Sequence, residues 1–293
     1  MTPAVWPVVL TQDAWRARAE AHEQRVTAWT EPYLRRRSRR EPHPVEDFLW
    51  TYYSYRPSAL RAWHPGWGTA VTGAVEAFGE LRGWTVDGDR AFIDPALVDR
   101  RAGQLAEIRD LLVATNARSP MLSCFGLHEW AMVYRQRPEQ VRHKIPLRLG
   151  GEATDAVVDA NRISCSHYDA YRFFTAEAVG LNARRPTLQT RVANEQPGCL
   201  HAGMDVYKWA SKLAPFTSAE LVADCFELAH DIRELDMRAS PYDLTAWGYS
   251  PVAIETPVGK AEYAHAQRAF AERSSELRLR VISLCDAVLA SRR

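Results

Sequence analysis

Apolar residues recur every three or four positions in four long stretches of the chain, the spacing that places them on one face of an α-helix. In the first stretch, residues 11–30, this face consists of Trp15, Ala19, His22, Val26 and Trp29. The same pattern predicts three more long helices, over residues 94–114, 217–235 and 258–290. We therefore expect helices to dominate the fold.

Local signals mark where some of these helices start and stop. Asp94 followed by Pro95 is typical of an N-cap with proline at the first helical position. Thr217 and Glu220 have the spacing of a capping box. Pro241 should end the helix that begins there, because proline removes a backbone donor and clashes with the preceding turn.

Evidence for strands is limited to short segments. Asp87-Gly88 lies between two short β-prone runs, residues 84–86 and 90–93, and indicates a tight hairpin. Further short strands are expected near residues 157–164 and 252–254. The sequence thus predicts a mainly α protein, a compact helical domain with a short β-hairpin and few minor strands. No break in composition divides the chain, so we expect residues 1–293 to form a single compact domain.

Composition limits the partner classes and the cellular location that we expect for the protein. The chain is 46% hydrophobic and 25% charged. Its formal net charge of +1 gives the protein no overall electrostatic attraction to nucleic acid or acidic membranes. No apolar run reaches the roughly 20 residues of a membrane span, and the first seven residues lack the basic start of a signal peptide. We expect a cytoplasmic protein without a membrane partner. The sequence leaves its oligomeric state open.

The five cysteines are widely spaced and form no CxxC pair, so they are expected to be small buried residues. One basic run stands out, Arg35-Arg36-Arg37-Ser38-Arg39-Arg40. It is suited either to contact phosphates or to form a solvated connector. It supports one hypothesis of function, a non-catalytic nucleotide or nucleic-acid binding protein.

Several common sites are excluded by their motifs. The chain contains no GxGxxG, no GxxxxGK[ST], no GxSxG and no HExxH. His128-Glu129 only begins the last of these, since position 132 is Met. A nicotinamide dehydrogenase, a P-loop phosphotransferase and an α/β-hydrolase are therefore not expected.

Histidines in the middle of the chain, His128, His167, His201 and His230 among them, have a carboxylate within four residues, which suggests a metal site. His201 and Asp205 share a helix face at i and i+4, and Glu227 and His230 do so at i and i+3. With His128 or His167 they can supply a nitrogen and oxygen ligand set. This predicts a metal-dependent oxygenase or hydrolase that uses iron, manganese or zinc.

The same region also suits chemistry on a nucleobase. Cleavage of an N-glycosidic bond develops positive charge on the sugar, which a carboxylate stabilises while aromatic rings stack on the base. Asp169 lies among aromatic residues and three positions before Arg172, which can neutralise a phosphate, and Glu129 lies beside Trp130. The alternative is that these aromatics are ordinary core residues and the acids pair with arginines.

A further polar segment follows the third predicted helix. Asp236 and Arg238 either face a cleft, where they contact a substrate, or form an internal ion pair. The sequence leaves both alternatives open.

Several segments together resemble a known family. They are His43-Pro-Val-Glu-Asp-Phe48, Trp63-His-Pro-Gly66, His128-Glu-Trp130, His167-Tyr-Asp-Ala-Tyr-Arg-Phe-Phe174, Glu195-Gln-Pro-Gly-Cys-Leu-His201, Asp205-Val-Tyr-Lys-Trp209 and Leu235-Asp-Met-Arg-Ala-Ser-Pro-Tyr-Asp243. Over nearly the whole chain, the sequence resembles a family of high-GC bacterial proteins labelled 3-methyladenine DNA glycosylase. The resemblance implies hydrolysis of an N-glycosidic bond in alkylated DNA or a related nucleoside, without a cofactor.

The site expected for this reaction combines the resemblance with the residues above. Asp169 or Glu129 would activate water, and His167 would assist proton transfer. The substrate-binding residues would be Trp130, Tyr171, Arg172, Lys208, Trp209, Asp236 and Arg238. The metal-dependent enzyme and the binding protein are kept as the second and third hypotheses.

Overall fold

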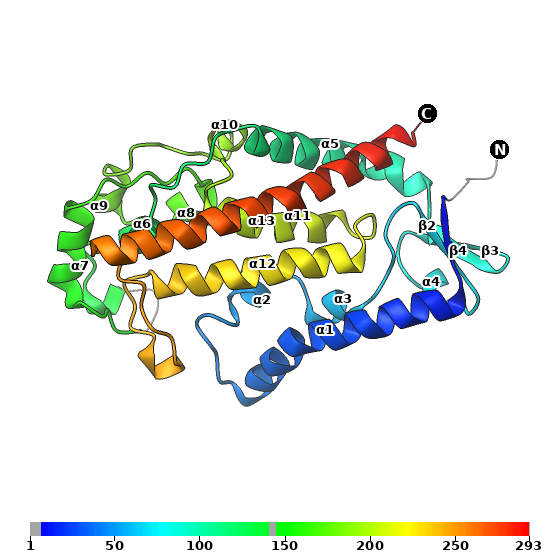
Figure 1. Ribbon diagram of the computed structural model, residues 1–293, viewed down its shortest axis with the longest axis horizontal. Helices are drawn as coiled ribbons and strands as arrows, with labels where there is room; N and C mark the ends of the chain where they lie inside the picture. Colours follow the sequence, from blue (N-terminus) through cyan, green and yellow to red (C-terminus); the bar gives the residue numbers. More distant parts are fainter. Residues whose placement is uncertain (1–6, 141–144, 293) are drawn as a thin grey trace. The chain divides into compact units, whose positions relative to one another are not determined.

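The computed structural model describes residues 7–140 and 145–292. Within these ranges the chain is mainly α, with thirteen α-helices and one four-stranded sheet (Figure 1). The predicted fold class is confirmed. Contacts along the chain divide it into two compact units. Unit 1 comprises residues 1–110, 206–227 and 277–293, and unit 2 comprises residues 111–205 and 228–276. The expectation of a single domain stays a prediction.

Unit 1 contains the sheet, whose strand order is β1-β2-β4-β3. Strand β1 (Val8–Leu10) pairs in parallel with β2 (Thr69–Thr72), which pairs antiparallel with β4 (Arg90–Ile93). Strand β3 (Trp84–Asp87) forms the predicted hairpin with β4 (Figure 1). Asp87 lies opposite Arg90, so the two turn residues are 88 and 89, and Gly88 takes the positive φ of 61° at the first of them.

The other strands do not form where the sequence suggested. Residues 157–159 belong to helix α7 (Gly150–Asp159), and Ile163 forms only an isolated bridge with Asn182. Residues 252–254 contain no strand. A short apolar run fits a buried helix face as well as a strand, and α7 buries Thr154 and Val158 one turn apart.

The long helix of unit 1 begins as predicted. In α1 (Gln12–Arg39), Oγ1 of Thr11 accepts a hydrogen bond from the backbone N–H of Ala14 at 3.4 Å. This helix passes through Pro32 and continues nine residues beyond the predicted end at Thr30. The remaining helices wholly in unit 1 are α2 (Phe48–Tyr52), α3 (Pro57–Arg61) and α4 (Glu76–Gly79).

Four helices contribute residues to both units: α5 (Ala96–Asn116), α11 (Leu200–Leu213), α12 (Ala219–Arg238) and α13 (Pro257–Ala290). Oδ1 of Asp94 caps α5 by accepting from the backbone N–H of Ala96 at 2.9 Å. At the start of α12, Ser218 rather than Thr217 is the cap, because its Oγ accepts from the backbone N–H of Leu221 at 3.2 Å. The Thr217 hydroxyl instead donates to the carbonyl of Ala210.

Unit 2 surrounds parts of these helices with short ones: α6 (Leu127–Ala131), α7, α8 (Tyr168–Tyr171), α9 (Ala176–Val179) and α10 (Arg191–Asn194). Within this unit α12 and α13 run side by side (Figure 1), joined by Arg273 and Asp231 at 2.9 Å. Helix α11 approaches them closely at Gly203, where an added Cβ would lie 2.9 Å from Cδ1 of Ile232. This glycine brings the start of α11 into the core of unit 2.

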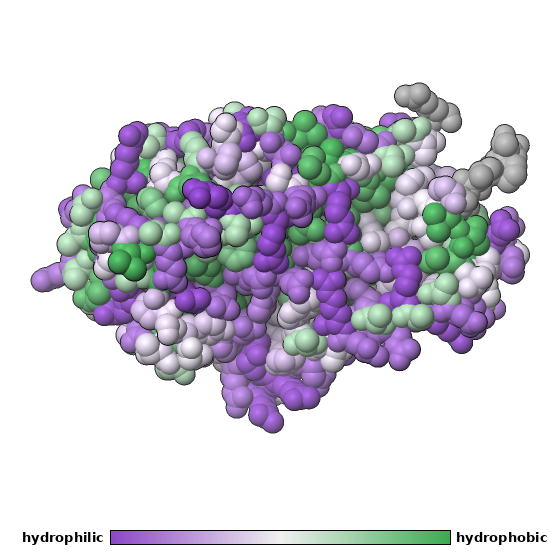
Figure 2. Space-filling model, viewed as in Figure 1, coloured by the Kyte–Doolittle hydropathy of each residue, from purple (hydrophilic) through white to green (hydrophobic). Residues whose placement is uncertain are grey.

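The surface is that of a mostly polar protein. Hydrophilic groups cover much of the face in Figure 2, and apolar groups interrupt them in several separate places. None of the helices in the described ranges combines the length and apolar character that crossing a membrane requires.

Candidate functional site

Unit 2 buries a group of ionisable side chains that lie close together. The described residues of this group each expose less than a tenth of their surface: His128, Glu129, His167, Glu195, His201, Asp205, Arg233 and Asp236. Burying charge is unfavourable unless it is paired or bound to a metal. The group is therefore the first place to look for a site.

Two histidines and one aspartate form the first cluster, which we call the His128 group. Helix α6 supplies His128, the first turn of α11 supplies His201, and the last turn of α12 supplies Asp236. Nε2 of His128 lies 2.9 Å from Oδ1 of Asp236. The His128 and His201 rings meet edge to face, with centroids 4.5 Å apart.

Arg233 joins this group to a second carboxylate. Its Nη1 lies 3.2 Å from Oδ2 of Asp236, one helix turn away, and 3.2 Å from Oε1 of Glu129. The guanidinium thus uses one oxygen of Asp236 and leaves Oδ1 to His128. Asp236 thus forms an internal ion pair with Arg233, whereas Arg238 pairs with Glu234 and Glu262.

The buried charges shift one another's protonation. Burial disfavours the imidazolium of His128, but the Asp236 carboxylate outweighs it and raises the pKa of His128 well above its usual value. For His201, burial and the neighbouring His128 hold the pKa well below the usual value. His201 is therefore a neutral imidazole, the form that binds metals.

The pKa values of the Asp236 and Glu129 carboxyl groups are shifted in opposite directions. Burial acts to raise the pKa of Asp236, yet His128 outweighs it and the pKa of Asp236 is lowered. Burial and the negative charge of Asp236 raise the pKa of Glu129, and Arg233 only partly offsets them. Asp236 is thus the carboxylate that stays ionised.

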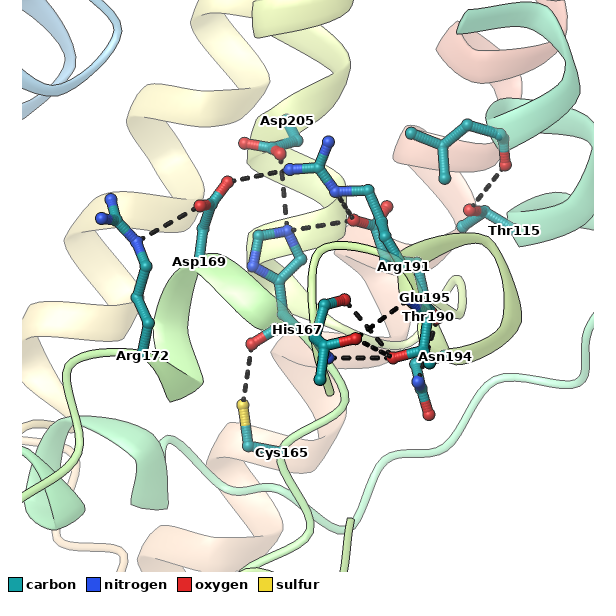
Figure 3. Close-up of polar contacts among 12 residues, drawn as sticks. Thr115, Cys165, His167, Asp169, Arg172, Thr190, Arg191, Asn194, Glu195 and Asp205 are labelled. Atoms are coloured by element: carbon teal, nitrogen blue, oxygen red, sulfur yellow. Dashed lines mark hydrogen bonds and ion pairs between the residues drawn. The ribbon is translucent and has the colours of Figure 1, made fainter. Parts of the chain in front are cut away.

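A second cluster, the His167 group, consists of His167, Glu195 and Asp205 (Figure 3). His167 precedes the first turn of α8, Glu195 follows α10, and Asp205 lies one turn after His201 on α11. Nε2 of His167 lies 3.5 Å from Oε1 of Glu195 and 3.4 Å from Oδ2 of Asp205. The His167 ring lies 5.4 Å from the His201 ring, centroid to centroid.

Asp169 lies outside both clusters, in a chain of ion pairs (Figure 3). Its Oδ2 accepts from Nη2 of Arg191 at 3.0 Å, and its Oδ1 lies 3.3 Å from Nε of Arg172. Arg191 also contacts Glu195, with Nε 3.0 Å from Oε1. The carboxylate that was expected to activate water is thus engaged by two guanidinium groups.

Each cluster has the composition and spacing of a set of metal ligands. In each, one donor atom per residue lies within 4.8 Å of the others, and all the residues are buried. In the His128 group, Nε2 of His128 lies 2.9 Å from Oδ1 of Asp236, the contact that raises the pKa of His128. Two atoms bound at right angles to one metal, each about 2.1 Å from it, lie about 3 Å apart.

A small cavity adjoins the His128 group. It has a volume of about 10 Å³, room for one water-sized molecule. The residues that line it are Cys124, His128, Ser164, Cys165, Ser166, Gln196, Cys199, Leu200, His201, Tyr263 and Gln267. Burial raises the pKa of the Cys165 and Cys199 thiols, so they stay protonated.

Two lining residues bring further polar atoms to this cavity. Sγ of Cys124 lies 3.6 Å from Nδ1 of His128. Nε2 of Gln267 donates to the carbonyl of Gly198 at 2.6 Å, while its Oε1 has no hydrogen-bond partner in the described part of the chain. A buried acceptor of this kind is usually satisfied by water or a ligand.

The structure separates the predicted ExxH pair from these clusters. Glu227 forms an ion pair with Arg25 at 2.8 Å, and its side chain is 46% exposed. Nδ1 of His230 lies 3.9 Å from Oδ1 of Asp231. The pair is therefore an ordinary helix surface.

The residues expected to bind substrate are also dispersed. The Trp130 ring is fully buried, and its Nε1 donates to the carbonyl of Ala239. Tyr171 packs on Phe174, with ring centroids 5.1 Å apart. Arg238 contacts Glu234 and the carbonyl of Ser250. Lys208 and Trp209 lie in the part of α11 that belongs to unit 1.

The arginine run occupies the exposed end of α1 in unit 1. Arg35 pairs with Glu31 and Arg36 with Asp47. Arg37 lines a surface pocket together with Arg56 and Arg61. Part of the run is thus neutralised within the protein.

Sequence reasoning missed Glu195 and two arginines that contact the clusters. Glu195 has no histidine at helical spacing, and it reaches His167 only because the chain turns between α10 and α11. Arg191 and Arg233 were not singled out among many arginines. The available signal was their spacing, Arg191 to Glu195 at i,i+4 and Arg233 to Asp236 at i,i+3.

Comparisons with protein-family models, with curated proteins and with solved structures find nothing that matches this chain.

Proposed function

We propose that this protein is a metal-dependent oxygenase that holds a first-row transition metal, such as iron(II), with His128, His201 and Asp236. The convergence of these side chains carries the proposal: two imidazoles and one carboxylate offer donor atoms within 4.8 Å of one another in a buried site. Two histidines and one carboxylate leave coordination positions open and are the ligand set of non-haem iron(II) oxygenases.

A small cavity lies beside the proposed metal ligands. It adjoins both His128 and His201 and has room for one water-sized molecule. A small ligand bound there would lie next to both imidazoles.

The protonation of the three ligands differs. His201 is a neutral imidazole and Asp236 is ionised, the forms that bind a metal. The Asp236 carboxylate raises the pKa of His128, so His128 would release a proton when a metal binds. Arg233 contacts only Oδ2 of Asp236 and fixes the orientation of the carboxylate. Such outer partners of metal ligands hold them in place and tune the site.

The metal content of purified protein tests the proposal. Protein prepared without chelator should contain bound iron or manganese by elemental analysis, and His201→Ala or Asp236→Asn should lose the metal of this group. His230→Ala is the matched control, because His230 lies on the same helix as Asp236 but outside the cluster. Wild-type protein that binds no metal, or variants that keep the full content, would rule the proposal out.

The open coordination position can be tested separately. Nitric oxide is a dioxygen analogue that gives non-haem iron(II) a characteristic electron paramagnetic resonance signal. Anaerobic protein loaded with iron(II) should develop this signal, and Asp236→Asn should not. A signal absent from iron-loaded wild type would remove the oxygenase assignment.

A further inference from the structure

The His167 group takes no part in the proposed oxygenase centre, although it is buried as deeply. The side chains of His167, Glu195 and Asp205 expose 1%, 3% and 2% of their surface. We propose that these residues hold a second divalent cation, so that unit 2 contains a two-metal centre. The role of this second cation rests on the proposed function, whereas the observations that support the second site are separate from it.

The geometry of the group suits a cation better than a hydrogen bond. Nε2 of His167 lies 3.5 Å and 3.4 Å from its two carboxylate oxygens. Hydrogen bonds between nitrogen and oxygen are about 2.7–3.2 Å long. Ligand atoms about 2.1 Å from a tetrahedral metal are separated by about 3.4 Å. Both carboxylates thus lie at the separation expected of neighbours on one cation.

An arginine contacts a carboxylate of each cluster, but not in the same way. Arg233 contacts Oδ2 of Asp236 and leaves Oδ1 to His128. Nε of Arg191 lies 3.0 Å from Oε1 of Glu195, the oxygen that also faces His167. In both clusters the arginine orients the carboxylate that would bind a metal.

Helix α11 connects the clusters. Its first turn gives His201 to the His128 group, and the residue four positions later, Asp205, goes to the His167 group. The His201 ring lies 4.5 Å from the His128 ring and 5.4 Å from the His167 ring. Together the six residues offer three imidazoles and three carboxylates, a set suited to iron, manganese or zinc.

Metal stoichiometry tests the second site. Protein stripped of metal is titrated with Mn²⁺ alone, and bound metal is counted after buffer exchange. We expect two equivalents per chain in wild type, one in His167→Gln and one in Asp236→Asn. Glu195→Gln, which keeps the size of the side chain, should also bind one, and His230→Ala should bind two. Circular dichroism confirms that each variant is folded.

The outcomes separate this inference from the proposed function. One equivalent in wild type that survives His167→Gln and disappears in Asp236→Asn would overturn the second site and leave the oxygenase centre intact. One equivalent that disappears in His167→Gln but survives in Asp236→Asn would support a cation at the His167 group and overturn the proposed function. No bound Mn²⁺ in wild type would overturn both.

Discussion

A carboxylate that is engaged by two guanidinium groups is a poor general base, because its lone pairs and its charge are already used. Asp169 is in this position, between Arg172 and Arg191. The aromatic residues next to Asp169 in the sequence suggested a catalytic acid, but in the folded protein its carboxylate contacts Arg172 and Arg191. The interpretation in which the acids pair with arginines describes Asp169 better than the catalytic one.

Replacing Asp169 tests these two interpretations directly. Asp169→Asn leaves the partly buried Arg191 and the exposed Arg172 without their shared partner, so we expect a loss of about 1–3 kcal/mol in the free energy of unfolding, measured with urea. Asp231→Asn is the control, since its exposed pair with Arg273 is worth at most about 1 kcal/mol. A glycosylase that uses Asp169 would instead lose release of 3-methyladenine from methylated DNA at unchanged stability.

His64 in unit 1 makes the folding stability of the protein depend on pH. Burial lowers the pKa of His64 to about 4, only partly opposed by Glu220. The unfolded chain takes up this proton near its ordinary pKa of about 6.5, whereas the folded chain resists it until about 4. The resulting stabilisation is complete above pH 6.5 and is lost as the pH falls towards 4.

Thermal melting between pH 4 and 7 measures this effect. We expect the loss of stability attributable to His64 to reach about 3 kcal/mol, and His64→Gln should show a correspondingly shallower decline towards acid pH. Carboxylates that titrate in the same range affect both proteins equally, so the difference between them isolates His64. Parallel pH profiles would contradict the lowered pKa.

At the scale of elements, the segment between α10 and α11 determines the site. It contains Glu195 and leads into the turn of α11 that presents His201. Gly198 lies within it, and its backbone N–H donates to Oε1 of Gln196 at 2.7 Å. A Cβ at this position would lie 2.7 Å from the backbone oxygen of Met121, which cannot move aside as a flexible side chain can.

Gly198→Ala should therefore displace this segment. We expect a loss of about 1–3 kcal/mol in unfolding free energy and weaker metal binding, measured by urea denaturation and by Mn²⁺ titration. Gly151→Ala in α7 is the matched control, because nothing lies within 4 Å of its added Cβ and alanine favours a helix. That variant should be equal to wild type or more stable. Equal behaviour of the two variants would contradict the close packing at Gly198.

Elements whose signals are local were predictable. The cap at Asp94, the hairpin at Asp87-Gly88 and the long helix α13 each depend on a few neighbouring residues, and each was confirmed. The segment at residues 157–164 was not, because a short apolar run fits a strand or a helix equally well. Helices of four or five residues, such as α8, have too few turns to show a period.

At the scale of the whole molecule, the candidate site could be predicted only in part. His128, His167, His201 and Asp205 were identified because each carries its own chemistry. Their division into two clusters could not be foreseen: His201 and Asp205 share a helix face, yet they contact different partners. Asp236 joined the His128 group through the packing of α6, α11 and α12 in unit 2, which no local pattern encodes.

Deep burial of the His128 group has a kinetic consequence. Its three residues expose at most 7% of their surface, so a chelator in solution cannot reach an ion held there while unit 2 is folded. Metal release then waits for a local opening of the unit. The rate of loss to EDTA should become independent of EDTA concentration, and Gly198→Ala should accelerate it. A rate that rises in proportion to EDTA would mean that the ion sits where solvent reaches it.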